Sequence, residues 1–292
     1  MLDFTQILAV VEELEQRLDQ LKDELGRIQA QAGVSEAEFG SSDVVPRAAA
    51  VIPPTSPPIE VIGGEETDQF PDCCAVGGDA GYYCSGTLIA PRVVVTADHC
   101  EDVPRGYHIT RVFLGGSDIY QPGQGETVPV LEQFSHPEVD LRVLVLERAA
   151  TVKHRPVADV ALLSGATHAT VVGFGNVDRD GSFGYGRKLR AEVPITTPDC
   201  AAVGDAKEYG CLPGREIVAG HTGLQVDSCT GDSGGPLYLK ANGDEYFLVG
   251  VTSRGQRSAS TVCGDGGIYV RVDLYLDWIH SVTGMEIGDL GR

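Results

Sequence analysis

The stretch DSCTGDSGGP, residues 227 to 236, decides how the rest of this chain is interpreted. A serine hydroxyl is a weak nucleophile at neutral pH and needs a positioned base, together with donors for the oxyanion that forms on attack. Glycines on both sides of Ser233 would allow a tight turn that presents backbone N–H groups to that oxyanion. The stretch therefore predicts a nucleophilic serine, if a histidine and an acid accompany it.

Two further motifs supply these companions, His99 in TADHC and Asp140 in DLRVLVLE. The order is His, Asp, Ser, with separations of 140 − 99 = 41 and 233 − 140 = 93 residues. With these motifs, residues 61 to 292 resemble the trypsin-like serine proteases of the chymotrypsin fold. The resemblance implies two packed antiparallel β-barrels, roughly 61–165 and 166–292, with the active site between them.

The pattern of short apolar runs agrees with a mainly β protein. RVVVTA, LRVLVLE, ATVVGFG, YFLVGVTS and GIYVRV are rich in β-branched residues and are bounded by Gly, Pro or Asp. One helix is expected near the C-terminus, where Leu274, Trp278, Ile279 and Val282 recur at helical spacing.

The resemblance assigns a role to each motif residue. Ser233 would attack the scissile carbonyl, His99 would take its proton, and Asp140 would hold the histidine tautomer. The backbone N–H groups of Gly231 and Ser233 would form the oxyanion hole. Ser253 is similar to the serine that also touches the aspartate.

The resemblance implies specificity for arginine or lysine at the cleaved position, because Asp227, six residues before Ser233, stands where trypsins carry the aspartate at the base of the primary pocket. A buried carboxylate in an open pocket needs a cationic partner, because burying it unpaired is costly. Gly255 and Gly267 match the small residues on the walls of that pocket. No metal or other cofactor is expected.

The stretch PPIEVIGGEE, residues 57 to 66, resembles the start of a mature protease of this family. A cut before Val61 would free an ammonium that pairs with Asp232, so the uncut chain would be a zymogen. With Asp227 in the pocket, the enzyme should not cut after Glu60, which points to activation by another protease. Ordering of the site by a bound partner is the alternative to cleavage.

Three residues depart from the family pattern. Asp98 stands beside His99 in place of alanine, and Arg142 follows Asp140 in place of a small residue. A charge beside the triad would perturb the histidine, and the two departures are candidates to pair with each other. Arg254 stands in place of tryptophan, which suggests a charged wall that favours acidic substrate residues upstream of the cut.

Eight cysteines lie between Cys73 and Cys263. The resemblance implies the bridges Cys84–Cys100 and Cys229–Cys263. It makes Cys200–Cys211 plausible but shifted, because Val218 stands where the family has its second cysteine. Cys73 and Cys74 match no family bridge.

Residues 1–33 predict a coiled coil that joins copies of the chain or binds a partner helix through residues 2–30. Its a and d positions are all apolar: Phe4, Ile7, Val11, Leu14, Leu18, Leu21, Leu25 and Ile28. A helix packed on the chain's own globular domain is the alternative. Residues 34–60 are rich in Ala, Ser and Pro, and they predict an extended linker that proteases can reach.

Composition narrows the partners. The formal net charge of −20 disfavours nucleic acid, and no apolar run reaches the roughly 20 residues that a bilayer requires. The N-terminus lacks the pattern of a secretory signal, which favours the cytoplasm, although the cysteines suit an oxidising compartment. The hypothesis is a bacterial trypsin-like endopeptidase in a proteolytic cascade. A protease-like binding or scaffold module without turnover is the alternative.

Overall fold

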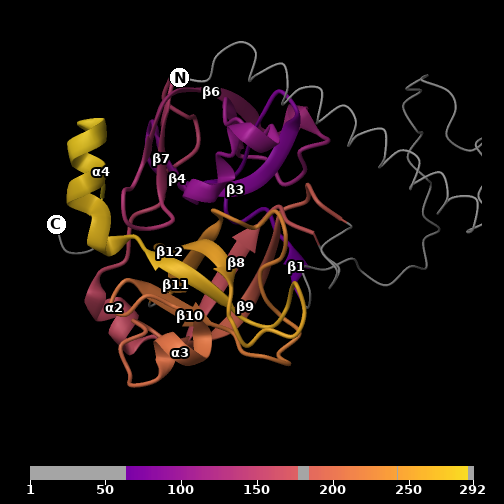
Figure 1. Ribbon diagram of the computed structural model, residues 1–292. Coiled ribbons are helices and arrows are strands. Elements are labelled where there is room, and N and C mark those ends of the chain that lie inside the picture. Colours follow the sequence, from indigo (N-terminus) through magenta and orange to yellow (C-terminus); the bar gives the residue numbers. More distant parts are fainter. Residues whose placement is uncertain (1–63, 177–183, 242, 289–292) are drawn as a thin grey trace, which may run out of the picture. The chain divides into compact units, whose positions relative to one another are not determined.

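The computed structural model describes residues 64–176, 184–241 and 243–288, and these form two antiparallel barrels (Figure 1). This confirms the mainly β fold that the short apolar runs predict. The predicted coiled coil, the linker and Val61 lie outside the described residues. In the part of the chain that the structure describes, no helix is long and apolar enough to cross a bilayer.

The first barrel closes in the order β2-β3-β4-β7-β6-β5. The run RVVVTA forms β4, whose three valines are fully buried, as a continuous apolar run predicts for a strand covered on both faces. The strands are β2 (Cys73–Gly78), β3 (Gly81–Ala90), β4 (Val93–Thr96), β5 (Arg111–Leu114), β6 (Glu126–Ser135) and β7 (Arg142–Leu146).

The second barrel closes in the order β9-β10-β13-β12-β11-β8, because β8 also pairs with β9. A short strand, β1 (Glu65–Glu66), pairs with Leu189 and Arg190 at the start of β9, ahead of the residues that pair with β10. Two short helices, α2 (Val160–Gly165) and α3 (Asp205–Tyr209), lie in its connections. The strands are β8 (His168–Gly173), β9 (Leu189–Thr197), β10 (Glu216–Ala219), β11 (Pro236–Lys240), β12 (Tyr246–Gly255) and β13 (Gly267–Arg271).

A buried ion pair holds the two barrels together. Asp72 precedes β2 of the first barrel and is fully buried. It accepts hydrogen bonds from Arg155 Nε at 3.0 Å and from the Tyr238 hydroxyl of β11 at 2.5 Å. The Arg155 guanidinium also lies over the rings of Phe70 and Tyr238. Because both oxygens of the carboxylate have partners, the junction of the barrels is a fixed frame for residues on either side.

The predicted C-terminal helix is present as α4 (Leu276–Thr283). It follows the second barrel in sequence but packs against the first, as Figure 1 shows. Leu276 and Ile279 are buried there, and the Trp278 ring meets the His136 ring at a centroid distance of 4.7 Å. The helix thus ties the end of the chain to the turn that precedes Asp140.

Candidate active site

His99 and Asp140 come together on the first barrel. His99 lies in a short 3-10 turn, Asp98–Cys100, directly after β4, and Asp140 lies just before β7. His99 Nδ1 is 2.8 Å from Asp140 Oδ2, and the His99 backbone N–H donates to Oδ1 at 3.0 Å. The carboxylate therefore fixes both the ring and the backbone of the histidine.

The environment of the pair favours the charged histidine. Burial opposes the imidazolium, but the hydrogen bond and the charge of Asp140 outweigh burial and raise the pKa of His99. Burial likewise opposes the carboxylate, but its bonds to His99 and Ser253 hold the pKa of Asp140 below its usual value. Such a pair can accept a proton on the imidazole and stabilise the cation that results.

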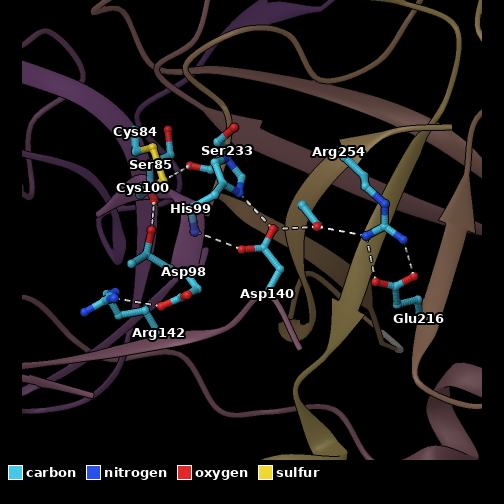
Figure 2. Close-up of polar contacts among 12 residues, drawn as sticks. Cys84, Ser85, Asp98, His99, Cys100, Asp140, Arg142, Glu216, Ser233 and Arg254 are labelled. Atoms are coloured by element: carbon cyan, nitrogen blue, oxygen red, sulfur yellow. Dashed lines mark hydrogen bonds and ion pairs between the residues drawn. A yellow bond between two sulfur atoms is a disulfide. The ribbon is translucent and has the colours of Figure 1, made fainter. Parts of the chain in front are cut away.

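Ser233 belongs to the second barrel, in the turn that leads into β11. In Figure 2 the His99 ring lies between Ser233 and the Asp140 carboxylate. The following Gly234 has a φ of +79°, and a Cβ there would lie 2.0 Å from Thr96 Oγ1 of β4. Only glycine fits this position, so the motif's glycine brings the serine turn against the first barrel.

Ser85 of β3 holds the same turn, and no sequence motif pointed to it. Its backbone N–H donates to the Ser233 carbonyl at 2.9 Å, and its hydroxyl donates to the Gly231 carbonyl at 2.9 Å. Because both carbonyls point towards Ser85, their orientation is fixed before any substrate binds. Within the described residues the Ser233 hydroxyl itself has no hydrogen-bond partner, and such contacts often tighten only when substrate is present.

A cavity of about 150 Å³ opens beside Ser233, with Asp227 in its lining. Asp227 is 2% exposed, and the Tyr269 hydroxyl donates to its Oδ1 at 2.8 Å. Burial raises the pKa of Asp227 to about 7, although the bonds from Ser228 and Tyr269 oppose the rise. A cationic side chain that enters this cavity would relieve the cost of the buried charge.

One of the two glycines expected in the cavity wall does not line the cavity. Gly255 lines it as expected, but Gly267 is absent from the lining, where its neighbour Gly266 stands. A Cβ at Gly267 would lie 3.0 Å from the Tyr269 hydroxyl, so this glycine makes room for the tyrosine that holds Asp227. A second lining acid, Asp265, accepts hydrogen bonds from Gly223, Ser260 and Thr261, so it serves the loop structure.

Asp232 is 1% exposed and turns away from the cavity. The backbone N–H groups of Gly175 and Cys229 donate to its two oxygens, each at 2.8 Å. Burial raises its pKa to about 6, against these two bonds. Among the described residues it forms no ion pair with any cationic side chain. A buried carboxylate with only neutral donors is a site that a cation would stabilise.

The three residues near the site that depart from the family pattern, Asp98, Arg142 and Arg254, all form ion pairs. Arg142 and Asp98 lie 2.8 Å apart, which is the pairing that the sequence made possible. Arg254 was expected to give the wall a charge, and its guanidinium is paired with the buried Glu216 (Figure 2). The preference for acidic substrate residues stays a prediction. The glutamate was not visible to sequence reasoning, since it lies 38 residues away in β10.

Three disulfides are present, Cys84–Cys100, Cys200–Cys211 and Cys229–Cys263. The first holds the His99 turn to β3, and the third joins the serine loop to the cavity wall. Cys73 and Cys74 are buried thiols of β2, and burial raises the pKa of both, which makes them unreactive packing residues. The disulfides favour an oxidising compartment and weaken the expectation of a cytoplasmic location.

Comparison with known proteins agrees with this geometry. A family model described as Trypsin matches residues 61–279. A protein from Saccharopolyspora erythraea named Trypsin is 34% identical over 232 residues, which span 74% of this chain and 95% of that protein. The fold also resembles a solved structure of neuropsin, a serine protease expressed in the limbic system of mouse brain. That match has a TM-score of 0.60 and 24% identity, and it covers 75% of this chain and 98% of the other.

Proposed function

The chain belongs to the trypsin family of serine proteases, and from this premise we propose that it is an endopeptidase that cleaves after arginine and lysine. The observation that carries the proposal is the cavity beside Ser233, which holds the buried Asp227. Arginine and lysine side chains match the length and the charge of such a site. Substrates are proteins or peptides with one of these residues before the cut.

The proposed reaction uses the geometry of the two barrels in turn. Ser233 attacks the scissile carbonyl while His99 takes its proton and then gives it to the leaving amine. Asp140, 2.8 Å from the ring, orients the imidazole and stabilises its charged form. The backbone N–H groups of Gly231 and Ser233 stabilise the oxyanion. Water then repeats the sequence on the acyl-enzyme and releases the second product.

A fluorophosphonate probe tests this mechanism directly, because it labels only an activated serine. Labelling of the activated protein is expected on Ser233, together with turnover of arginine and lysine peptides. Ser233→Ala should abolish labelling and lower turnover by about a millionfold, as in related triads. A variant of comparable activity, or an unlabelled parent protein, would contradict the proposal and favour a binding module.

Activation is proposed to follow a cut before Val61. The freed ammonium would pair with Asp232, whose buried carboxylate has only backbone donors among the described residues. Burying that new ion pair would order the turn that carries Gly231 and Ser233. Uncut protein would then be a zymogen with low activity.

The cut itself is assigned to another protease. The residue before Val61 is Glu60, and Asp227 would repel a glutamate in the cavity. We therefore place this protein downstream of a distinct activating protease, within a cascade. Self-processing of purified protein to a Val61 terminus would contradict that order of events.

Assembly through residues 2–30 completes the proposal. Leu18 is one of eight apolar heptad positions, and Leu18→Asp would place a charge in the seam. Light scattering should show a smaller species for this variant than for the parent chain. Identical masses, with no captured partner helix, would show that the segment does not mediate association.

A further inference from the structure

Arg254 and Glu216 form an ion pair on the second barrel that is connected to Asp140 through Ser253. Arg254 belongs to β12 and Glu216 to β10, and two hydrogen bonds of 2.8 Å join the guanidinium to both carboxylate oxygens. Glu216 is 1% exposed, and the Leu212 N–H also donates to it at 2.7 Å. Arg254 makes a further bond to the Gly210 carbonyl. Four bonds therefore hold the pair in a single arrangement.

The pair reaches Asp140 through Ser253. Arg254 Nη1, which donates to Glu216, also donates to Ser253 Oγ at 3.1 Å, and Ser253 Oγ lies 2.6 Å from Asp140 Oδ2. A hydroxyl has one hydrogen and two lone pairs, whereas a guanidinium only donates. The arginine therefore occupies a lone pair of the serine, and the hydroxyl hydrogen is directed to Asp140.

The orientation of that hydrogen matters because Oδ2 is also the oxygen that meets His99 Nδ1. A donated bond from Ser253 holds this oxygen in place and keeps the carboxylate ionised, as the lowered pKa of Asp140 agrees. If the Ser253 hydroxyl rotated away, Asp140 would lose one of the contacts that fix its plane. The histidine ring would lose orientation with it.

The charges of the pair cancel at a place where a lone charge would be costly. Other acids near His99 also have partners: Asp98 pairs with Arg142, Glu138 with Arg215, and Asp102 with Arg105. Two further titratable side chains lie near His99. Tyr83 lines one surface pocket that His99 also lines, and His136 lines another. Removing one member of the Arg254–Glu216 pair would leave a net charge near the His99–Asp140 couple.

We propose that Arg254 and Glu216 form a positioning pair, which directs the Ser253 hydroxyl to Asp140 and thereby orients His99 without adding net charge. The proposal rests on the proposed serine-protease mechanism. In that mechanism Glu216 is absent from the lining of the cavity beside Ser233, whereas Arg254 belongs to that lining. The proposal also accounts for an arginine at a position where the family has tryptophan, since the ion pair takes the place of an apolar wall.

The test compares four activated proteins, the parent, Arg254→Met, Glu216→Gln and the double variant, each normalised by titration of labelled Ser233. Arg254→Met should lower kcat about tenfold, because the triad loses orientation. The uncancelled Glu216 would favour the imidazolium, so the acid limb of kcat/KM should move to higher pH by about half a unit. Arg254 also lines the cavity, so the KM comparison uses Glu216→Gln, whose side chain lies outside the lining and whose KM should stay near that of the parent.

Glu216→Gln should move the acid limb in the opposite direction, because a lone guanidinium disfavours the imidazolium. The double variant leaves neither charge of the pair, so an effect of one unpaired charge is absent from it. It should restore the parent pH profile while kcat stays low. Arg148→Met is the matched control, because it removes an arginine from an ion pair with Glu126 that contacts no member of the triad. This control should keep the parent kcat and pH profile.

Two outcomes separate this inference from the mechanism on which it rests. A labelled, active parent whose variants all keep its kcat and acid limb would overturn the positioning pair alone. Equal losses in every variant with no opposite shifts in pH would also overturn it, since a merely structural role predicts that result. An unlabelled and inactive parent would overturn the proposed mechanism and the pair together.

Discussion

Charges on the two sides of the active site are matched differently. On the first-barrel side, Asp140 meets His99 and Asp98 meets Arg142, each at 2.8 Å. On the second-barrel side, Asp227 and Asp232 are buried with only neutral hydrogen-bond donors among the described residues. Burial raises their pKa values to about 7 and about 6. Among the described residues, the carboxylates on the first side therefore have basic partners, whereas the two on the second side have neutral donors.

This difference gives the two carboxylates separate roles in the account. In the proposed mechanism Asp227 would pair with a cation of the substrate, and Asp232 would pair with the ammonium freed by a cut before Val61. If the proposal holds, binding of either cation would stabilise the second barrel's side of the site.

Among changes to these two acids, the largest effect is expected from Asp227→Ser, which removes the proposed partner of the substrate cation. Activity on arginine peptides should fall roughly a thousandfold, because the substrate guanidinium would be buried without an opposing charge. Steady-state kinetics on arginine and phenylalanine peptides would measure the change. Asp244→Asn removes an exposed acid of the same charge and serves as control. A peptide library cut mainly after Phe, Leu or Glu by the parent protein would show that the specificity is wrong.

A smaller loss is expected from Asp232→Asn. The amide has no charge to pair with a new N-terminal ammonium, so protein cut before Val61 should lose activity roughly a hundredfold. The same substitution should leave the uncut protein's low activity unchanged. If the cut variant retained full activity, Asp232 would have no part in activation.

The smallest effect concerns the stability of uncut Ser233→Ala protein. The folded pKa values of Asp227 and Asp232 lie above the unfolded value, so the folded state binds protons more tightly between about pH 4 and pH 7. Their contribution is fully present below about pH 4 and is lost as the pH rises through about 6 and 7. Between pH 5 and pH 6 these two acids should lower the free energy of unfolding by about 2 kcal/mol. Thermal unfolding of the parent and of Asp227→Asn/Asp232→Asn would measure it, and equal pH dependence in both would refute the assignment.

Sequence reasoning reached the parts of the site that short motifs encode. The strands, the C-terminal helix and the placement of His99, Asp140 and Ser233 all lie in contiguous stretches whose residue types limit the structure. At Gly234, which the motif carries, any side chain would clash with β4, so only glycine fits the position.

What sequence reasoning missed depends on residues distant in the chain. Ser85 contacts the serine turn from 146 residues away in sequence, measured to Gly231, and no local pattern marks it. The pairing of Arg254 was not anticipated, because its partner Glu216 lies on another strand. Gly266 lines the cavity where Gly267 was expected, because the conformation of a loop, and not its composition, decides which of the two glycines faces the cavity.

Amino-terminal sequencing of fluorophosphonate-labelled protein tests the central claim most directly. The account holds that the second side of the site is completed by a cation at the chain's own new terminus. It predicts that the labelled species begins at Val61, and that protein with residues 57–66 intact labels far more slowly. Full labelling of protein with that stretch uncut would contradict the account and would show that the site orders without the new ammonium.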